Sequence, residues 1–319
     1  MDLRKPLSLV AAAGLLALPA ATHASAPDPS KLGGAGEDTS GADTDGQAGS
    51  YTPEDLPETL VVSAVIRDFK AYNQEGGHDD FQRYSGTTRI GLVADELGED
   101  GKPVLASQTG FKITSEFRDS SGNPINPRLY DPALGDSAGS LEERSDNRIY
   151  SAEGFKHWYN DVPGVNVTKV VPLELRLIPG TSTYVFDSAQ DQPYKSIGGF
   201  FPINGEGYGN YSGGKNFHFT TEVATEFVYR RGEGFNFKFT GDDDVWVFVD
   251  GKLVIDMGSL HSRKEQHLDL DRLEWLEDGK VYSLHVFHAE RRTSQSNFRI
   301  QTTLQLRPIK TAAATGLHD

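Results

Sequence analysis

The sequence predicts an all-β protein, an antiparallel β-sandwich with long loops and a few short helices. Phe235, Phe237 and Phe239 alternate with polar residues, as on a strand with one buried face. Asp250-Gly251 separates two apolar runs and is typical of a tight hairpin turn. Helical periodicity is weak, and short apolar runs alternate with Gly- and Pro-rich turns. Together these features favour a sandwich.

The apolar runs predict the individual elements. We expect strands over 60–69, 226–230, 235–240, 245–249, 252–256, 281–288 and 298–306, short helices over 94–97, 152–158 and 270–276, and long loops over about 110–215. The strand 245–249 is apolar on both faces, so Trp246 and Phe248 are expected in the core. Trp158 could be either a core residue or a surface platform for a sugar ring.

Composition and charge exclude several classes of protein. The 319 residues carry a formal net charge of −15, which disfavours nucleic acid and anionic membranes as partners. The chain contains no cysteine, which excludes a disulfide-stapled scaffold, a thiolate zinc site and a cysteine nucleophile.

The two ends of the chain differ from its middle. Residues 1–24 have the basic start, apolar run and small-residue end of a signal peptide. Residues 25–58 are acidic and poor in apolar residues, so we expect a disordered linker. A single domain over 59–308 and a flexible tail over 309–319 follow. The protein is thus predicted to be exported without membrane insertion, and to be secreted, at the cell surface or in the periplasm.

Asp242, Asp243 and Asp244 run directly into the strand 245–249. Three adjacent carboxylates could bind a cation, act in catalysis or simply face solvent. Calcium fits the first alternative, since it takes about six to eight oxygen ligands. A glycosidase would need two carboxylates, for example Asp243 or Asp244 with Asp256 or Glu290, but nothing in their spacing demands it. H-E-x-x-H is absent from the sequence, and we do not expect an enzyme.

Several separated segments resemble one family, the fibro-slime domain. They are 241–258 with His261, 157–166, 200–203, 216–227 and 289–302. The likeness covers about residues 60–306. That family is similar to the carbohydrate-binding β-sandwich first named from the anthrax protective antigen, so the resemblance implies a lectin-like jelly roll that serves binding or adhesion.

The resemblance also implies a site. In lectins of the wider group, two adjacent aspartates joined by a cis peptide bind calcium, and sugar hydroxyls coordinate the ion. The pair falls on Asp242 and Asp243, while Asp244 stands where glycine is frequent, so which two of the three bind the ion stays open. The second loop falls on 290–297. The metal ligands implied are Asp242, Asp243, Asp244 and Asn297, and the ligand-binding loop contains Glu290, Arg291 and Gln295.

These observations predict an exported, calcium-dependent adhesion protein that binds glycans or matrix polysaccharide near Asp242 and Asp243, with self-association as a further expectation. Two alternatives stay open. One is a structural matrix protein that binds no sugar, and the other is a polysaccharide hydrolase.

Overall fold

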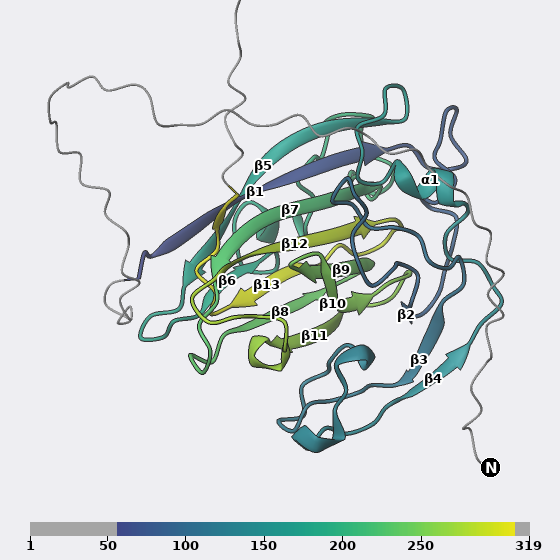
Figure 1. Cartoon of the computed structure of the whole chain (residues 1–319). Coiled ribbons are helices and arrows are strands. Elements are labelled where there is room, and N and C mark those ends of the chain that lie inside the picture. Colours follow the sequence, from purple (N-terminus) through teal and green to yellow (C-terminus); the bar gives the residue numbers. More distant parts are fainter. Residues whose placement is uncertain (1–55, 310–319) are drawn as a thin grey trace, which may run out of the picture. The chain divides into compact units, whose positions relative to one another are not determined.

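The computed structural model describes residues 56–309, which form antiparallel strands with only two short α-helices, α1 (Ala152–Lys156) and α2 (Tyr194–Ile197) (Figure 1). The strands are β1 (Thr59–Phe69), β2 (Arg89–Ile90), β3 (Phe111–Ser115), β4 (Ser140–Glu143), β5 (Asn166–Leu177), β6 (Tyr184–Asp187), β7 (Phe219–Val228), β8 (Asn236–Gly241), β9 (Asp244–Val249), β10 (Lys252–Met257), β11 (Lys264–Asp269), β12 (Val281–Glu290), β13 (Phe298–Thr302) and β14 (Arg307–Pro308). The all-β, antiparallel fold class is therefore confirmed.

The predicted signal peptide, the linker up to residue 55 and the tail from residue 310 lie outside the described residues. The last three residues assigned to the linker, 56–58, contact the folded domain. Leu56 packs against the core, the Tyr184 hydroxyl donates to Pro57 O (2.7 Å), and Leu177 N donates to Glu58 O (2.9 Å).

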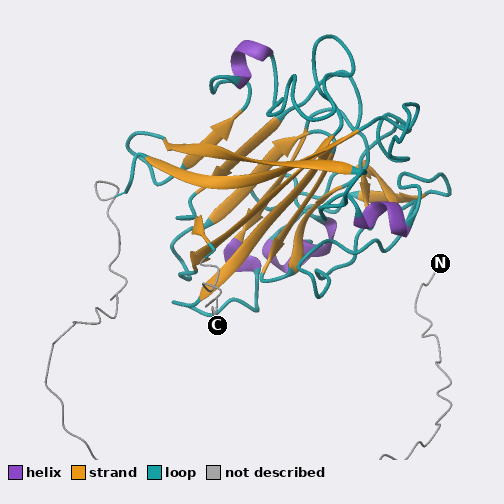
Figure 2. Ribbon diagram, turned by 90° about the horizontal axis from the view of Figure 1, so that it is seen from above, coloured by secondary structure: helices purple, strands orange, loops and turns teal. Residues whose placement is uncertain are grey.

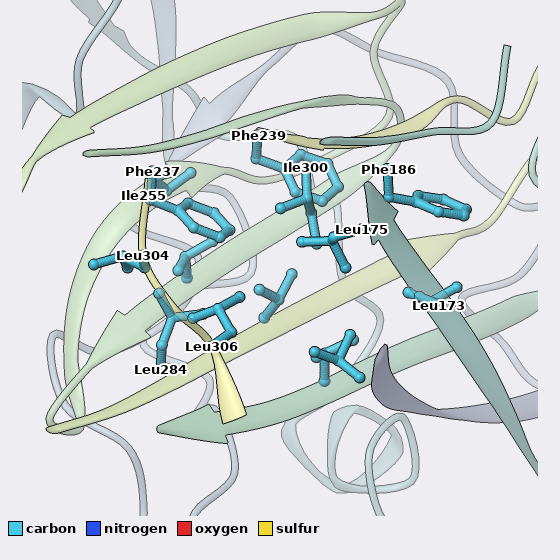
Figure 3. Packing of buried hydrophobic residues seen from close by; sticks show 14 of the residues in the cluster. Leu173, Leu175, Phe186, Phe237, Phe239, Ile255, Leu284, Ile300, Leu304 and Leu306 are labelled. Carbon is cyan, nitrogen blue, oxygen red and sulfur yellow. The ribbon is translucent and has the colours of Figure 1, made fainter. Parts of the chain in front are cut away.

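Most strands belong to one sheet, in the order β10-β9-β12-β7-β1-β5-β6-β13-β8-β11, with β14 added beside β7. Its two ends meet, because β10 contacts β11. The sheet therefore folds back on itself around a main core that takes residues from both halves, including Leu173, Phe186, Phe239 and Ile300 (Figure 3). A second, three-stranded sheet has the order β2-β3-β4, and loops gather at the strand ends (Figure 2).

β9 separates two cores. Val245, Val247 and Val249 face the main core, whereas Trp246 and Phe248 face a second, aromatic core under the segment that precedes β3. This confirms the prediction that the strand is buried on both faces. Trp158 also belongs to the second core and has no exposed surface, so the sugar-platform alternative for this residue is wrong.

The helix expected over 94–97 is wrong. Val93 bridges to Leu105 and Glu96 bridges to Lys252 of β10, because this extended segment pairs with the hairpin and covers the second core. The other two helices are shorter than expected: α1 ends at Lys156, and Leu270–Arg272 is a single 3-10 turn.

The segment 110–215 contains four strands and both α-helices in addition to its loops, which corrects the expectation of loops alone. Pro172 lies within β5 and obscured the alternation of its neighbours, since proline is rare in central strands. It is tolerated because β6 pairs with β5 only at Arg176 and Leu177, which leaves Pro172 on an unpaired edge. The strand expected over 298–306 ends at Thr302.

Candidate functional site

The three aspartates lie at the entry to β9, and all are buried, with 3%, 7% and 0% of Asp242, Asp243 and Asp244 exposed. The peptide bond between Asp242 and Asp243 is cis, as the resemblance implies. The alternative in which the three carboxylates simply face solvent is therefore wrong. Buried carboxylates need hydrogen-bond or ion-pair partners.

Asp244 is separated from the other two by its partner. Its Oδ2 accepts from Arg291 Nε (2.6 Å), and its Oδ1 accepts from Ser259 N (2.6 Å). Neither side chain of this ion pair is exposed. Arg291 also donates to Arg148 O (2.9 Å) and lies over the ring of Trp158, with its Cζ 4.7 Å from the ring centroid. Asp244 and Arg291 thus form a neutral pair beneath the site.

Asp242 and Asp243 line a cavity of about 260 Å³. Three loops complete it: Ser85–Gly86, Leu260–Ser262 and Arg292–Gln295. The walls therefore present several hydroxyls, one amide and one guanidinium beside the two carboxylates, which is a donor and acceptor set suited to a polar ligand.

Backbone and side-chain donors hold the two carboxylates in position. Asn297 donates to both oxygens of Asp242, through its backbone N and through Nδ2 (2.9 Å). Asp243 accepts from His261 N (3.2 Å) and Arg291 N (3.3 Å). His288 Nε2 lies 2.8 Å from Asp242 O. The pair is thus fixed by β12, the loop after it and the loop after β10.

Glu290, at the end of β12, is a further buried carboxylate near the pair. Burial raises its pKa well above the ordinary value, and the charges of Asp243 and Asp242 add to the effect. Its Oε2 has no hydrogen-bond partner among the described residues. Burial, followed by the charges of Asp244 and Asp242, likewise raises the pKa of Asp243.

The cluster of buried carboxylates fits a divalent cation, which would take the place of the protons that burial favours. Asp244 is paired with Arg291, and among residues 56–309 the carboxylates of Asp242, Asp243 and Glu290 have no ion-pair partner of their own. Within residues 56–309, no three His, Asp or Glu side chains are placed to hold one metal ion together. An ion at this position would therefore take the two cavity carboxylates with amide oxygens, backbone carbonyls and water, a ligand set that suits calcium.

The structure brings some of the expected residues together and separates others. Asp242, Asp243 and Gln295 share the cavity, and Asn297 is bonded to Asp242. Glu290 and Arg291, expected in the ligand-binding loop, are instead fully buried behind it, because β12 continues through Glu290 and Arg291 turns inward to Asp244.

Sequence reasoning missed four residues that line this cavity outside the expected 290–297 loop, Ser85, Gly86, Leu260 and Ser262, and within that loop it did not single out Arg292, Thr293 or Ser294. Ser85 and Gly86 lie far from the aspartates along the chain, and nothing in their local pattern marks them. Arg292 carried a weak signal, as a charged residue within a loop already expected at the site.

Asp256, the other carboxylate considered for catalysis, does not line this cavity. Its Oδ1 accepts from Trp246 Nε1 (3.1 Å) and its Oδ2 from Gly91 N (2.8 Å), so it joins β10 to the segment before β3. Its role in these contacts is structural. Burial raises the pKa of Asp256 to about 7.

This pKa predicts a pH dependence of stability. Between about pH 4 and pH 7 the folded state holds the Asp256 proton that the unfolded state releases, so the free energy of unfolding falls as pH rises and levels off above pH 7. The Asp256→Asn variant should lack this contribution, whose slope is at most about 1.4 kcal/mol per pH unit. Urea unfolding of both proteins from pH 5 to pH 8 in chelator measures the difference between their free energies of unfolding at each pH. The contributions of other titrating groups cancel in this difference. Parallel curves would contradict the prediction.

Among residues 56–309, none of the helices has the length and apolar character needed to cross a bilayer. Residues 234–314, which contain the aspartates and the 290–297 loop, match the PA14 domain model. PA14 domains are associated with carbohydrate binding and adhesion, which fits a binding role.

Similar proteins occur in Dictyostelium discoideum. The chain is 33% identical over 260 residues to protein psiD, covering 78% of this chain and 42% of psiD. It is 32% identical over 260 residues to protein psiH, covering 78% of this chain and 31% of psiH. The chain thus spans less than half the length of either relative. Among solved structures, the PA14 domain of the antifreeze protein MpAFP is 15% identical, with a TM-score of 0.22 and coverage of 33% of this chain and 48% of that chain. Residues 234–314 therefore match the PA14 domain, a carbohydrate-binding β-sandwich-like fold, and the chain is homologous to the Dictyostelium psi proteins.

Proposed function

We propose that this domain binds glycans through a calcium ion held by Asp242 and Asp243, with Asn297 as the nearby amide ligand. The proposal extends the general binding role of PA14 domains to a specific ion and a specific edge of the sandwich. We also propose that the domain is of the fibro-slime type, because its separated motifs resemble that family.

The observation that supports it most directly is the pairing of the two carboxylates in one cavity above a buried carboxylate oxygen without a partner. Bringing Asp242, Asp243 and Glu290 together is costly unless positive charge is supplied. Arg291 offsets only part of this cost, because its guanidinium is bonded to Asp244. A calcium ion would offset the charge and offer free coordination positions to sugar hydroxyls.

The chain's own residues would orient the sugar. Ser262, Thr293 and Ser294 present hydroxyls around the carboxylates, Gln295 presents an amide, and Arg292 presents a guanidinium. Each can donate to ring or hydroxyl oxygens, and the hydroxyls and the amide can also accept. Recognition through such exposed polar contacts is modest for one site, so strong attachment would need several copies.

Thermal melting in excess calcium and in chelator tests the proposal. Calcium at about 100 times its Kd should stabilise the native sequence by about 2.7 kcal/mol, and the midpoint should rise accordingly. The Asp243→Asn variant should lose the response, since one ligand charge is gone. Asp250→Asn is the matched control: it makes the same change in the turn between β9 and β10, where the positive φ of 53° tolerates asparagine.

Identical melts of the native sequence with and without calcium would remove the ion from the proposal. With the ion established, glycan binding in calcium and its loss in chelator test the ligand. Attachment to a matrix polymer that free sugars do not compete away would instead favour the structural role.

We also propose that the protein is exported and works in the secreted fraction or at the cell surface. The support is the pattern of residues 1–24, which has the three parts of a signal peptide. N-terminal sequencing of the protein recovered outside the cytoplasm should begin at residue 25.

A further inference from the structure

A larger cavity of about 450 Å³ adjoins the one at the aspartate pair. The two share three lining residues, Gly86, His261 and Ser262. The two cavities are therefore adjacent, with these residues bordering both.

The larger cavity lies between the three-stranded sheet and the β10–β11 edge of the main sheet. One wall comes from β3 and the residues after it, and the other from Met257 and the first residues of β11. The PA14 match covers the second wall but not the first. The cavity thus depends on a segment that lies outside the PA14 match.

Backbone hydrogen bonds fix the two walls on either side of the cavity. At one side Arg89 and Gly258 exchange both backbone bonds (2.8 Å each). At the other side His267 N donates to Pro124 O (2.7 Å). A third tie, between Lys264 Nζ and Glu116 Oε1 (3.2 Å), joins side chains of the two walls. The space is therefore held open by the fold and needs no rearrangement to accept a ligand.

The lining is chemically mixed in the way a sugar residue requires. Thr88, Thr114 and Ser115 provide hydroxyls, and the charged residues of both signs, such as Lys264 and Glu265, provide donors and acceptors. Phe117 adds an aromatic side chain, held edge-on against Tyr130 with ring centroids 5.5 Å apart. A volume of about 450 Å³ lies within the range of about 300–1,000 Å³ typical of small-molecule sites.

From this geometry we propose that the larger cavity is a second glycan subsite, so that the protein binds adjacent residues within a polysaccharide chain rather than one terminal sugar. The inference rests on the proposed function, because the first sugar must be bound at the aspartate pair. His261 and Ser262 then lie at the junction, where the linkage between the two sugars would pass.

The test compares chain lengths. Binding of glucose, mannose and N-acetylglucosamine, and of their β-linked di- and tetrasaccharides, to the full chain in calcium is measured by calorimetry. In any series that binds, the tetrasaccharide should bind at least about 10-fold more tightly than the monosaccharide, which corresponds to about 1.4 kcal/mol.

Two variants assign the gain to the larger cavity. Ser115→Trp fills it and should reduce tetrasaccharide affinity to that of the monosaccharide, without changing monosaccharide affinity or the calcium-dependent midpoint. Lys264→Ala, at a half-exposed position at the start of β11, should weaken only the longer ligand by several-fold. Ser145→Trp is the matched control, because Ser145 is exposed, follows β4 and lines neither cavity.

The possible failures can be told apart. Equal affinity for mono- and tetrasaccharide, or full retention of the gain in Ser115→Trp, would overturn the second subsite while the calcium-dependent site stands. Binding in no series, together with no calcium response in melting, would overturn both the proposed function and this inference.

Discussion

Replacing Arg291 by methionine should reduce the free energy of unfolding by about 3–5 kcal/mol, the loss expected when one partner of a buried ion pair is removed. Arg291 and Asp244 are both fully buried and lie 2.6 Å apart. Methionine fills part of the space but leaves the Asp244 carboxylate charged and desolvated, and it also removes the donor to Arg148 O and the cation over Trp158.

Urea unfolding in chelator measures this loss free of any contribution from a bound ion. Arg299→Met is the matched control, since the Arg299–Asp187 pair is longer, at 3.3 Å, and partly exposed, and should cost less than about 1 kcal/mol. Adding Asp244→Asn to Arg291→Met should recover much of the loss, because asparagine removes the buried charge and keeps an oxygen for Ser259 N. Equal stability of Arg291→Met and the native sequence would contradict the account of this pair.

Replacing Trp158 by alanine should also cost about 3–5 kcal/mol, the usual loss for a large aromatic residue in a core. The indole packs against Phe155 and Trp246, with ring centroids at 4.9 and 6.2 Å. Its Nε1 donates to Asp80 Oδ2 (3.2 Å), so the alanine variant leaves that buried carboxylate with one donor fewer.

Thermal and urea unfolding of Trp158→Ala, Trp158→Phe and Tyr150→Ala tests this prediction. Phenylalanine restores much of the volume and should recover part of the loss. Tyr150, which is 46% exposed, should cost under about 1 kcal/mol on removal, as is usual for surface residues. Loss of glycan binding without loss of stability in Trp158→Ala would instead place this residue at the ligand.

The C-terminal half of the fold could be predicted because its signals are local. The alternation around Phe237 and the Asp250-Gly251 turn define β8, β9 and β10 within a short stretch of sequence. β5 could not be predicted in the same way. The strand is stable because it pairs with β1 from Asn166 to Arg176, a long-range contact that the sequence around Pro172 does not reveal.

The part of the site that could be predicted lies in two sequence motifs, the aspartates before β9 and the loop after β12. Asp242, Asp243 and Gln295 lie in motifs that resemble a known family, and the structure gathers them in one cavity. Assigning Asp244 a different role depends on Arg291, whose inward direction follows from packing under β12 and cannot be read from the loop sequence. Gly86 lines both cavities and Phe117 lines the larger one, and the fold of the segment that contains the three-stranded sheet brings them there.

The chain entry and exit lie toward one end of β7, and the aspartate pair lies near the other end. The chain enters the domain at β1, which runs antiparallel to β7 and pairs with it from Ala64, opposite Val223, so that the start of β1 points toward the end of β7. It leaves the domain at β14, which pairs with Thr225 and Glu226 near that end. The aspartate pair lies near the opposite end, where Phe219 of β7 pairs with Glu290. Ten residues of strand separate the two ends, about 30 Å. A domain held in a longer chain by both its ends would therefore direct its cavities outward, away from the points of attachment.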